Sequence, residues 1–218
     1  MTERHIVQRK RNRGQYDFEA LCAVLDDTIV CHVGFVQDGE PVVIPMLYAR
    51  DGRDLLLHGS VASRLLGELA KGIPVCVTVT HIDGLVLAAS VFDHSVNYRS
   101  AVIFGKAHEI EDPDEKARIF DHMVEYMIPG RTKEARPANH KETAATTVLR
   151  LSIDSFSVKQ RKGPAGPVDA GDPKNVWTGV ISLSTHCGPP QTEQDPGQVP
   201  DYISDYRLDA DRLNRRKS

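Results

Sequence analysis

The sequence has few cysteines, and their spacing does not suit a metal site. Its 218 residues include four, Cys22, Cys31, Cys76 and Cys187, and no Cys-x-x-Cys pair. Zinc sites usually take ligands from closely spaced pairs, and disulfide frameworks occur in cysteine-dense secreted chains. Three of the four lie in apolar segments, where a free buried thiol is the ordinary state. We therefore expect neither a disulfide framework nor a bound structural metal.

Long apolar runs and a large excess of one charge are also missing. No apolar stretch approaches the roughly 20 residues that a membrane-spanning helix needs. The polar N-terminus lacks the apolar region of a signal peptide, and the formal net charge is only −3. These features predict a cytoplasmic protein with no membrane partner.

The basic run Arg9–Arg13 has two interpretations. It suits an arm that binds nucleic acid, or a solvated terminal tail. The slight acidity of the whole chain and the absence of a helix-turn-helix pattern favour the tail. We therefore expect no nucleic-acid partner, and DNA binding at low salt would contradict this expectation.

Two common nucleotide-binding fingerprints are absent. The sequence contains neither Gly-x-Gly-x-x-Gly nor Gly-x-x-x-x-Gly-Lys-Ser/Thr, and its helices do not alternate regularly with strands. Short apolar segments are instead separated by Asp-Gly pairs, which are typical of hairpin turns. The pattern predicts a mainly β fold of the α+β class, an antiparallel barrel with peripheral helices.

The expected domain organisation is simple. We predict a polar N-terminal tail over residues 1–14, one domain over 15–185 and a polar, proline-rich extension over 186–218. The predicted helices cover 17–27, with Asp17 as its N-cap, and 60–71, and a third begins at Asp112. The predicted strands cover 28–36, 41–49, 55–58, 75–82, 85–91, 99–110, 147–158 and 176–183.

The stretch from Leu55 to Leu66 predicts an anion-binding turn. An apolar strand ends at His58-Gly59, Ser60 then opens a helix, and Arg64 lies in the first turn. A basic side chain at the positive end of a helix dipole is unfavourable unless an anion such as phosphate binds there. Ser60, Ser63 and Arg64 would supply hydroxyl groups and a charge for that phosphate. A plain N-cap at Ser60 with a solvated Arg64 would give the same pattern.

Two further segments have both a functional and a structural interpretation. Residues 94–100 place Tyr98 and Arg99 at the start of a long strand, where a barrel rim suits ligand contacts. The same cluster could be a polar loop in which Tyr98 caps the core. Pro45 marks an edge or bulge of the strand 41–49. Its free backbone groups could bind a planar heterocycle, or the segment could be a plain edge strand.

Together these motifs resemble one known family. From about Gln15 to Leu183 the chain is similar to the pyridoxamine 5′-phosphate oxidase-like FMN-binding split-barrel superfamily, in particular its flavin-nucleotide-binding, nitroimidazole-resistance-related branch. The resemblance rests on the order and spacing of several short motifs. They are Ile44-Pro45-Met46, Leu57-His58-Gly59-Ser60 with Ser63-Arg64, Ser95–Ser100, Arg161–Pro164 and Trp177–Gly179.

This resemblance implies an antiparallel split barrel that binds FMN at a homodimer interface. The implied flavin contacts are Ser63 and Arg64 at the phosphate, His58, Gly59 and Ser60 along the ribityl path, Ile44, Pro45 and Met46 beside the ring, Tyr98, Arg99 and Ser100 from the long strand, and Trp177 from the other subunit. Leu65 stands where the oxidase has another basic residue, and the oxidase's arginine-rich C-terminal signature is not recognisable. Oxidation of pyridoxine phosphate is therefore not expected.

Two functions follow from the resemblance. The first is an FMN-dependent oxidoreductase that acts on a small planar substrate, in which the flavin supplies the chemistry. His58 and Tyr98 are the candidate acid–base groups, and neither is assigned as catalytic. The second is a non-catalytic flavin or haem carrier or sensor. Rapid reduction of the bound flavin by NADPH would exclude a pure store.

The phosphate assignment predicts the effect of one substitution. Arg64→Ala should weaken FMN retention, because it removes the fixed positive charge at the helix N-terminus. The visible absorption spectrum of the purified protein, followed by titration with FMN, measures this effect. Undiminished FMN affinity in the variant would show that the phosphate binds elsewhere.

Overall fold

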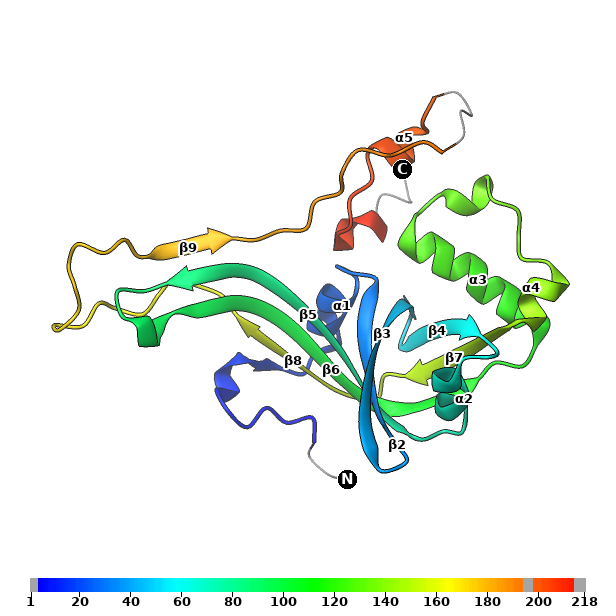
Figure 1. Cartoon of the computed structure of the whole chain (residues 1–218), viewed down its shortest axis with the longest axis horizontal. Coiled ribbons are helices and arrows are strands. Elements are labelled where there is room, and N and C mark those ends of the chain that lie inside the picture. The colour runs from blue at the N-terminus through cyan, green and yellow to red at the C-terminus, as the bar shows by residue number, and fades with distance from the viewer. Residues whose placement is uncertain (1–3, 194–197, 214–218) are drawn as a thin grey trace.

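The chain folds around a closed ring of antiparallel strands (Figure 1). The computed structural model describes residues 4–193 and 198–213. Within them, β6, β7, β4, β3, β2 and β5 are hydrogen-bonded in that order, and β5 pairs with β6 to close the ring. β1 and β8 extend the sheet beside β6, and β9 extends it beside β5. The strands are β1 Gly14–Gln15, β2 Val30–Gln37, β3 Glu40–Asp51, β4 Asp54–Ser60, β5 Pro74–Leu87, β6 Ser95–Glu109, β7 Thr146–Ser152, β8 Ser155–Arg161 and β9 Gly179–Ser182. This is the predicted split-barrel architecture.

The helices lie outside the ring of strands. α1 contacts β5, β6 and β8, α2 contacts β4, β6 and β7, and α3 contacts β3 (Figure 1). Their bounds are α1 Phe18–Leu25, α2 Arg64–Ala70, α3 Pro113–Met127, α4 His140–Ala144 and α5 Asp201–Ser204. Among the helices of the described residues, none has the length and apolar character needed to cross a membrane.

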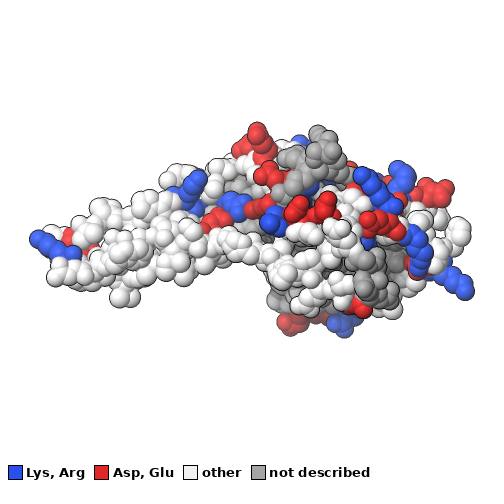
Figure 2. Space-filling view, turned by 90° about the horizontal axis from the view of Figure 1, so that it is seen from above, with Lys and Arg blue, Asp and Glu red and all other residues white. Residues whose placement is uncertain are grey.

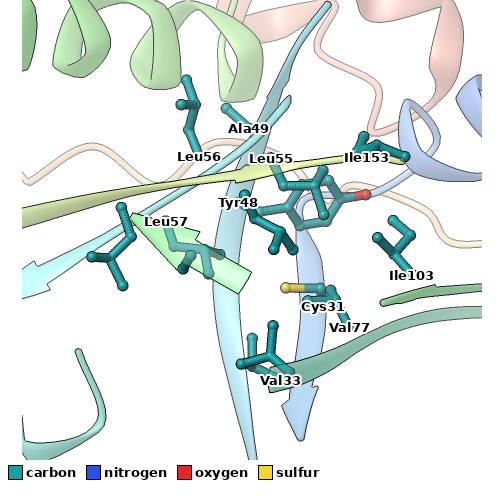
Figure 3. Close-up of a cluster of buried hydrophobic side chains, with 14 of the residues drawn as sticks. Cys31, Val33, Tyr48, Ala49, Leu55, Leu56, Leu57, Val77, Ile103 and Ile153 are labelled. Carbon is teal, nitrogen blue, oxygen red and sulfur yellow. The ribbon is translucent and has the colours of Figure 1, made fainter. Parts of the chain in front are cut away.

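The core fills the ring and also the space beneath the helices. Along β2 burial alternates, and Cys31, Val33 and Phe35 point inward. On β4 the three consecutive side chains of Leu55, Leu56 and Leu57 are all buried, although neighbouring side chains on a strand point to opposite faces. Figure 3 shows the reason: Leu56 points toward the helical layer, away from Cys31 and Val33. Both faces of β4 are therefore covered.

β5 and β6 continue beyond the ring as a long arm. We define the arm as residues 79–102 together with β8, β9 and the loop 162–178. Its strands run far to one side of the barrel (Figure 1). Val91 and Phe92, in the short 3-10 helix that joins β5 to β6, are 92% and 94% exposed. Figure 2 shows charged side chains gathered on the body of the molecule, while the visible face of the arm is mainly uncharged.

Several helix and turn signals are confirmed. The Asp17 side chain caps α1 by accepting from the Ala20 amide, and Asp112 caps α3 with Pro113 as its first residue. Asp38 and Gly39 both have positive φ, so they form the two-residue turn between β2 and β3. These caps and turns depend only on neighbouring residues, which is why the sequence predicts them.

Several predicted boundaries are wrong. β6 begins at Ser95 and not at Arg99, and β5 ends at Leu87 and not at Val91. Asp83-Gly84 forms no hairpin, because β5 runs through it with a bulge between Ile82 and Gly84. A Cβ on Gly84 would lie 2.9 Å from the Ile181 carbonyl oxygen, so this glycine allows β9 to approach. The segment 147–158 contains two strands, β7 and β8, and not one. Ser60 is the last residue of β4, and α2 begins at Arg64 with Ser63 as its N-cap.

Candidate functional site

A largely apolar cavity lies between α3 and the adjoining ends of β3 and β4. Its volume is about 340 Å³, within the range of small-molecule sites. We call it the His58 cavity, because His58 supplies the imidazole among side chains that are otherwise mostly apolar. The lining residues used below are Ile29, Leu47, His58, Phe120, Met123 and Met127.

The alternation of β4 directs His58 into this cavity. Leu56 and His58 lie two residues apart, so both side chains leave the strand on the face that α3 covers. The Phe120 ring of α3 meets the imidazole edge-on, with the ring centroids 6.4 Å apart and the planes at 69°. β4 and α3 together fix the position of the ring.

One nitrogen of the His58 imidazole lacks a hydrogen-bonding partner among the described residues. Its Nδ1 atom is buried and makes no hydrogen bond within the part of the chain that the structure describes. Burial lowers the pKa of the imidazole below its usual value, which favours the neutral ring. Buried polar atoms in native proteins are almost always paired, so an unpaired one needs an explanation. A neutral imidazole is also the form that binds metal ions.

The predicted phosphate turn follows His58 directly. The Ser63 hydroxyl oxygen accepts a hydrogen bond of 3.4 Å from the Leu66 amide, and the Ser60 hydroxyl oxygen accepts one of 3.2 Å from Ala62. Arg64 is exposed and makes no ion pair or hydrogen bond with any described residue. Its charge at the N-terminal end of α2 is therefore not compensated within this part of the chain.

Gly59 has a packing role in this turn. A Cβ at this position would lie 2.8 Å from Cδ1 of Leu66, so a larger residue would force the Leu66 side chain of α2 to move. The sequence prediction placed Gly59 on the cofactor path, and the structure shows a constraint from packing at the same position.

The three predicted ring contacts on β3 do not share a face. Ile44 and Met46 pack against the core, whereas Pro45 is exposed on the opposite side of the strand. Val43 and Leu47 lie on the same face as Pro45 and are 65% and 43% exposed. A planar ligand on this outer face would meet the side chain of Pro45, but not those of Ile44 and Met46.

Tyr98, Arg99 and Ser100 lie on the arm, outside the His58 cavity. The Arg99 guanidinium donates to Asp83 and also forms a 2.8 Å ion pair with Asp27. These hydrogen bonds, with Asp83 as the larger cause, raise the pKa of Arg99. The Ser100 hydroxyl donates to the Lys159 carbonyl oxygen at 3.3 Å. Arg99 is thus already engaged by two carboxylates.

Trp177 also belongs to the arm. Its side chain is 64% exposed, and its ring lies over Gly179, where an added Cβ would be only 2.6 Å from the indole. Trp177 therefore does not line the His58 cavity of its own chain.

The α3 wall of the cavity is absent from the predicted site. Phe120, Met123 and Met127 follow the helical spacing of an apolar face, which the sequence alone cannot distinguish from ordinary core packing. Only the tertiary structure places this face opposite His58. Among the described residues, no group of three or more His, Cys, Asp or Glu side chains could hold a metal ion.

The ring closure between β5 and β6 and the peripheral helices define the class of protein: an antiparallel split barrel. Residues 17–160 match the family model described as pyridoxamine 5′-phosphate oxidase. The chain belongs to the pyridoxamine 5′-phosphate oxidase-like family. Among proteins with curated functional descriptions, none matches it.

Two solved structures resemble the chain over most of its length. The FAD and haem binding protein from Mycobacterium smegmatis is 38% identical, with a TM-score of 0.82, over 88% of this chain and 95% of that protein. The flavocytochrome Anf3 from Azotobacter vinelandii is 36% identical, with a TM-score of 0.86, over 93% of this chain and 95% of that one.

A third structure shares the fold at lower similarity. It is a protein from Bacteroides thetaiotaomicron assigned to 5-nitroimidazole antibiotic resistance, 22% identical with a TM-score of 0.57. The match covers 67% of this chain and 85% of that protein. The branch suggested by the motifs is thus more distant from this chain than the two flavin- and haem-related proteins are.

The environment of His58 predicts its titration. Because burial lowers the pKa, His58 should protonate in the folded protein below the usual 6.5. In the window between this lowered value and 6.5, the unfolded chain binds more protons, so acidification should destabilise the fold. NMR titration of the histidine ring protons, assigned with His58→Gln, measures this directly. A midpoint at or above 6.5 would contradict the prediction.

Proposed function

We propose that this protein binds a haem in the His58 cavity and a flavin beside it. The observation that carries the proposal is the half-buried imidazole of His58 in a largely apolar cavity, with its Nδ1 atom buried and unpaired among the described residues. The two relatives that match most of the chain are described as an FAD and haem binding protein and a flavocytochrome, which supports both cofactors.

The residues of the cavity fit a haem. A neutral imidazole is a common ligand of haem iron, and His58 places one in the lining of this cavity. The apolar side chains of Leu47, Phe120 and Met123 suit a porphyrin face and exclude water from it. Phe120 would also limit rotation of the imidazole. A bound haem would supply one-electron chemistry at its iron.

The turn at the start of α2 fits the phosphate of a flavin. Arg64 has no partner among the described residues, and Ser60 and Ser63 keep their hydroxyl hydrogens available to a phosphate oxygen. The motif resemblance implies FMN. The Mycobacterium smegmatis relative is an FAD and haem binding protein, so we favour FAD for this chain.

The two proposed sites lie on one continuous segment. His58 is on β4 and Arg64 opens α2 only six residues later, so the two cofactors would be close neighbours. Proximity of this kind suits electron transfer between them. We therefore favour an electron-transferring flavin and haem protein over an oxidoreductase specific for a small planar substrate. In either function the protein would bind and orient the cofactors.

Replacing His58 should separate haem binding from flavin binding. His58→Ala should lose the Soret band, or weaken haem affinity by at least about ten-fold, because it removes the proposed iron ligand. Flavin content should stay unchanged, because Arg64 and the N-terminus of α2 remain. His108→Ala is the matched control, since His108 is an exposed histidine of β6 outside the cavity.

Three results would contradict the assignment. They are normal haem binding in His58→Ala, an equal loss in His108→Ala, and wild-type protein that takes up no haem on reconstitution. Mass spectrometry of the flavin released from the same samples distinguishes FAD from FMN. Released FMN alone would overturn our preference for FAD but not the haem assignment.

We also propose that a second copy of the chain covers the outer face of the β2–β3 hairpin. Val30, Val43 and Leu47 are exposed on this face around Pro45 and His32, and exposed apolar clusters of this kind are typical of interaction surfaces. Leu47 also lines the His58 cavity, so the same partner would help to close it.

A charge in this patch should dissociate the homodimer. Val43→Asp places an unpaired carboxylate in the proposed interface, which is costly when buried. Light scattering coupled to size exclusion should give a dimer for the wild type and a monomer for the variant. Val168→Asp, at a 54% exposed position in the loop 162–178, is the comparison. A monomeric wild type would refute the proposal.

A further inference from the structure

Arg212 is a buried cation near the end of the described chain. Its side chain is 1% exposed and belongs to the C-terminal segment, defined here as residues 198–213. The guanidinium donates to four backbone carbonyl oxygens: Tyr126 at 3.0 Å, Asp209 at 2.9 Å, Thr28 at 3.2 Å and Asp26. It also lies over the Tyr126 ring, 4.8 Å from the centroid.

Two helix ends meet at this guanidinium. α1 ends at Leu25 and α3 ends at Met127, and the last carbonyl groups of a helix have no partner within it. The negative ends of both helix dipoles also favour a cation there. Arg212 therefore binds a carbonyl at each helix end, which compensates the cost of burying its charge.

Neighbouring contacts strengthen the same junction. The Tyr206 hydroxyl, also in the C-terminal segment, donates to the Met127 carbonyl oxygen at 2.8 Å. The Tyr126 hydroxyl donates to the Leu25 carbonyl oxygen at 3.0 Å, and so joins α3 to α1 directly. The junction thus depends on the C-terminal segment as well as on the two helices.

The residues that follow two of the carbonyl groups bound by Arg212 line the His58 cavity. Ile29 follows Thr28, and Met127 follows Tyr126, and both side chains line the cavity. Ile29 leads into β2, whereas Met127 belongs to the wall formed by α3. A change in the separation of the two carbonyls would therefore change the distance between two walls of the cavity.

We propose that Arg212 is a positioning residue for the His58 cavity. It holds the α3 wall against the start of β2 without lining the cavity itself. A loosened wall would admit water and release the bound group faster. The effect on haem rests on the proposed function, whereas the effect on the protein itself can be measured without haem.

The first test is the rate of haem loss from reconstituted protein to an excess of apomyoglobin. Arg212→Gln should release haem about ten-fold faster, because it removes a charge that two helix ends share. Arg212→Lys keeps the charge but lacks the branched set of donors, so it should give partial rescue. Lys133→Gln removes an exposed cation just beyond α3 and should leave the rate unchanged.

The second test uses hydrogen exchange on the protein without haem. In Arg212→Gln, protection should fall together in the last turn of α3, around residues 28–30, and in the C-terminal segment. Tyr206→Phe removes a single hydrogen bond and is a milder change. It should lower the protection of backbone amides from exchange in α3, with or without a matching loss in the C-terminal segment. Loss confined to residues 198–213, with α3 unchanged, would overturn the positioning role. A wild type that binds no haem would refute the proposed function and leave this second test valid.

Discussion

The pairing of β5 with β6 is the constraint on which the rest of the structure depends. These strands are hydrogen-bonded from Pro74 to Val86, and this contact turns an open sheet into a closed ring. Within the ring, closure leaves no free sheet edge and gives each ring strand an inner and an outer face. The same two strands extend past the ring, where β8 and β9 cover their flanks, so one pairing forms both barrel and arm.

Because the closed ring has an inner and an outer face, the alternation along each strand decides which side chains point into the core and which point outward. On β4, Leu55 and Leu57 enter the core, whereas Leu56 and His58 face α3. His58 thus lies in a largely apolar layer between sheet and helix, where no described residue forms a hydrogen bond with its buried Nδ1 atom. The turn that follows leaves Arg64 exposed at the start of α2. The imidazole proposed to bind haem and the guanidinium proposed to bind phosphate therefore lie within a few residues of each other.

Local signals in the sequence predicted much of this arrangement. The caps Asp17 and Asp112, the turn at Asp38-Gly39 and most strands follow from neighbouring residues alone. The predictions were wrong where contacts with segments distant in the sequence determine the local structure. Gly84 permits β9 to approach, so Asp83-Gly84 makes a bulge and no turn. Ile44 and Met46 were grouped with Pro45 by a motif, but alternation places them on opposite faces. The cavity-lining face of α3 carries no signal that separates it from core.

From the sequence alone we predicted the class of fold and the family, and we proposed the segment from His58 to Arg64 as a candidate site. Those features lie in local periodicity, turn chemistry and the order of short motifs. Only the tertiary structure showed that Arg99 is held by Asp27 and Asp83, that α3 covers His58, and that Arg212 joins the ends of α1 and α3. The physical reason is the same in each case. The surroundings of a charged group or an imidazole are formed by residues far away in the sequence. The closure of the ring decides which of these residues come into contact.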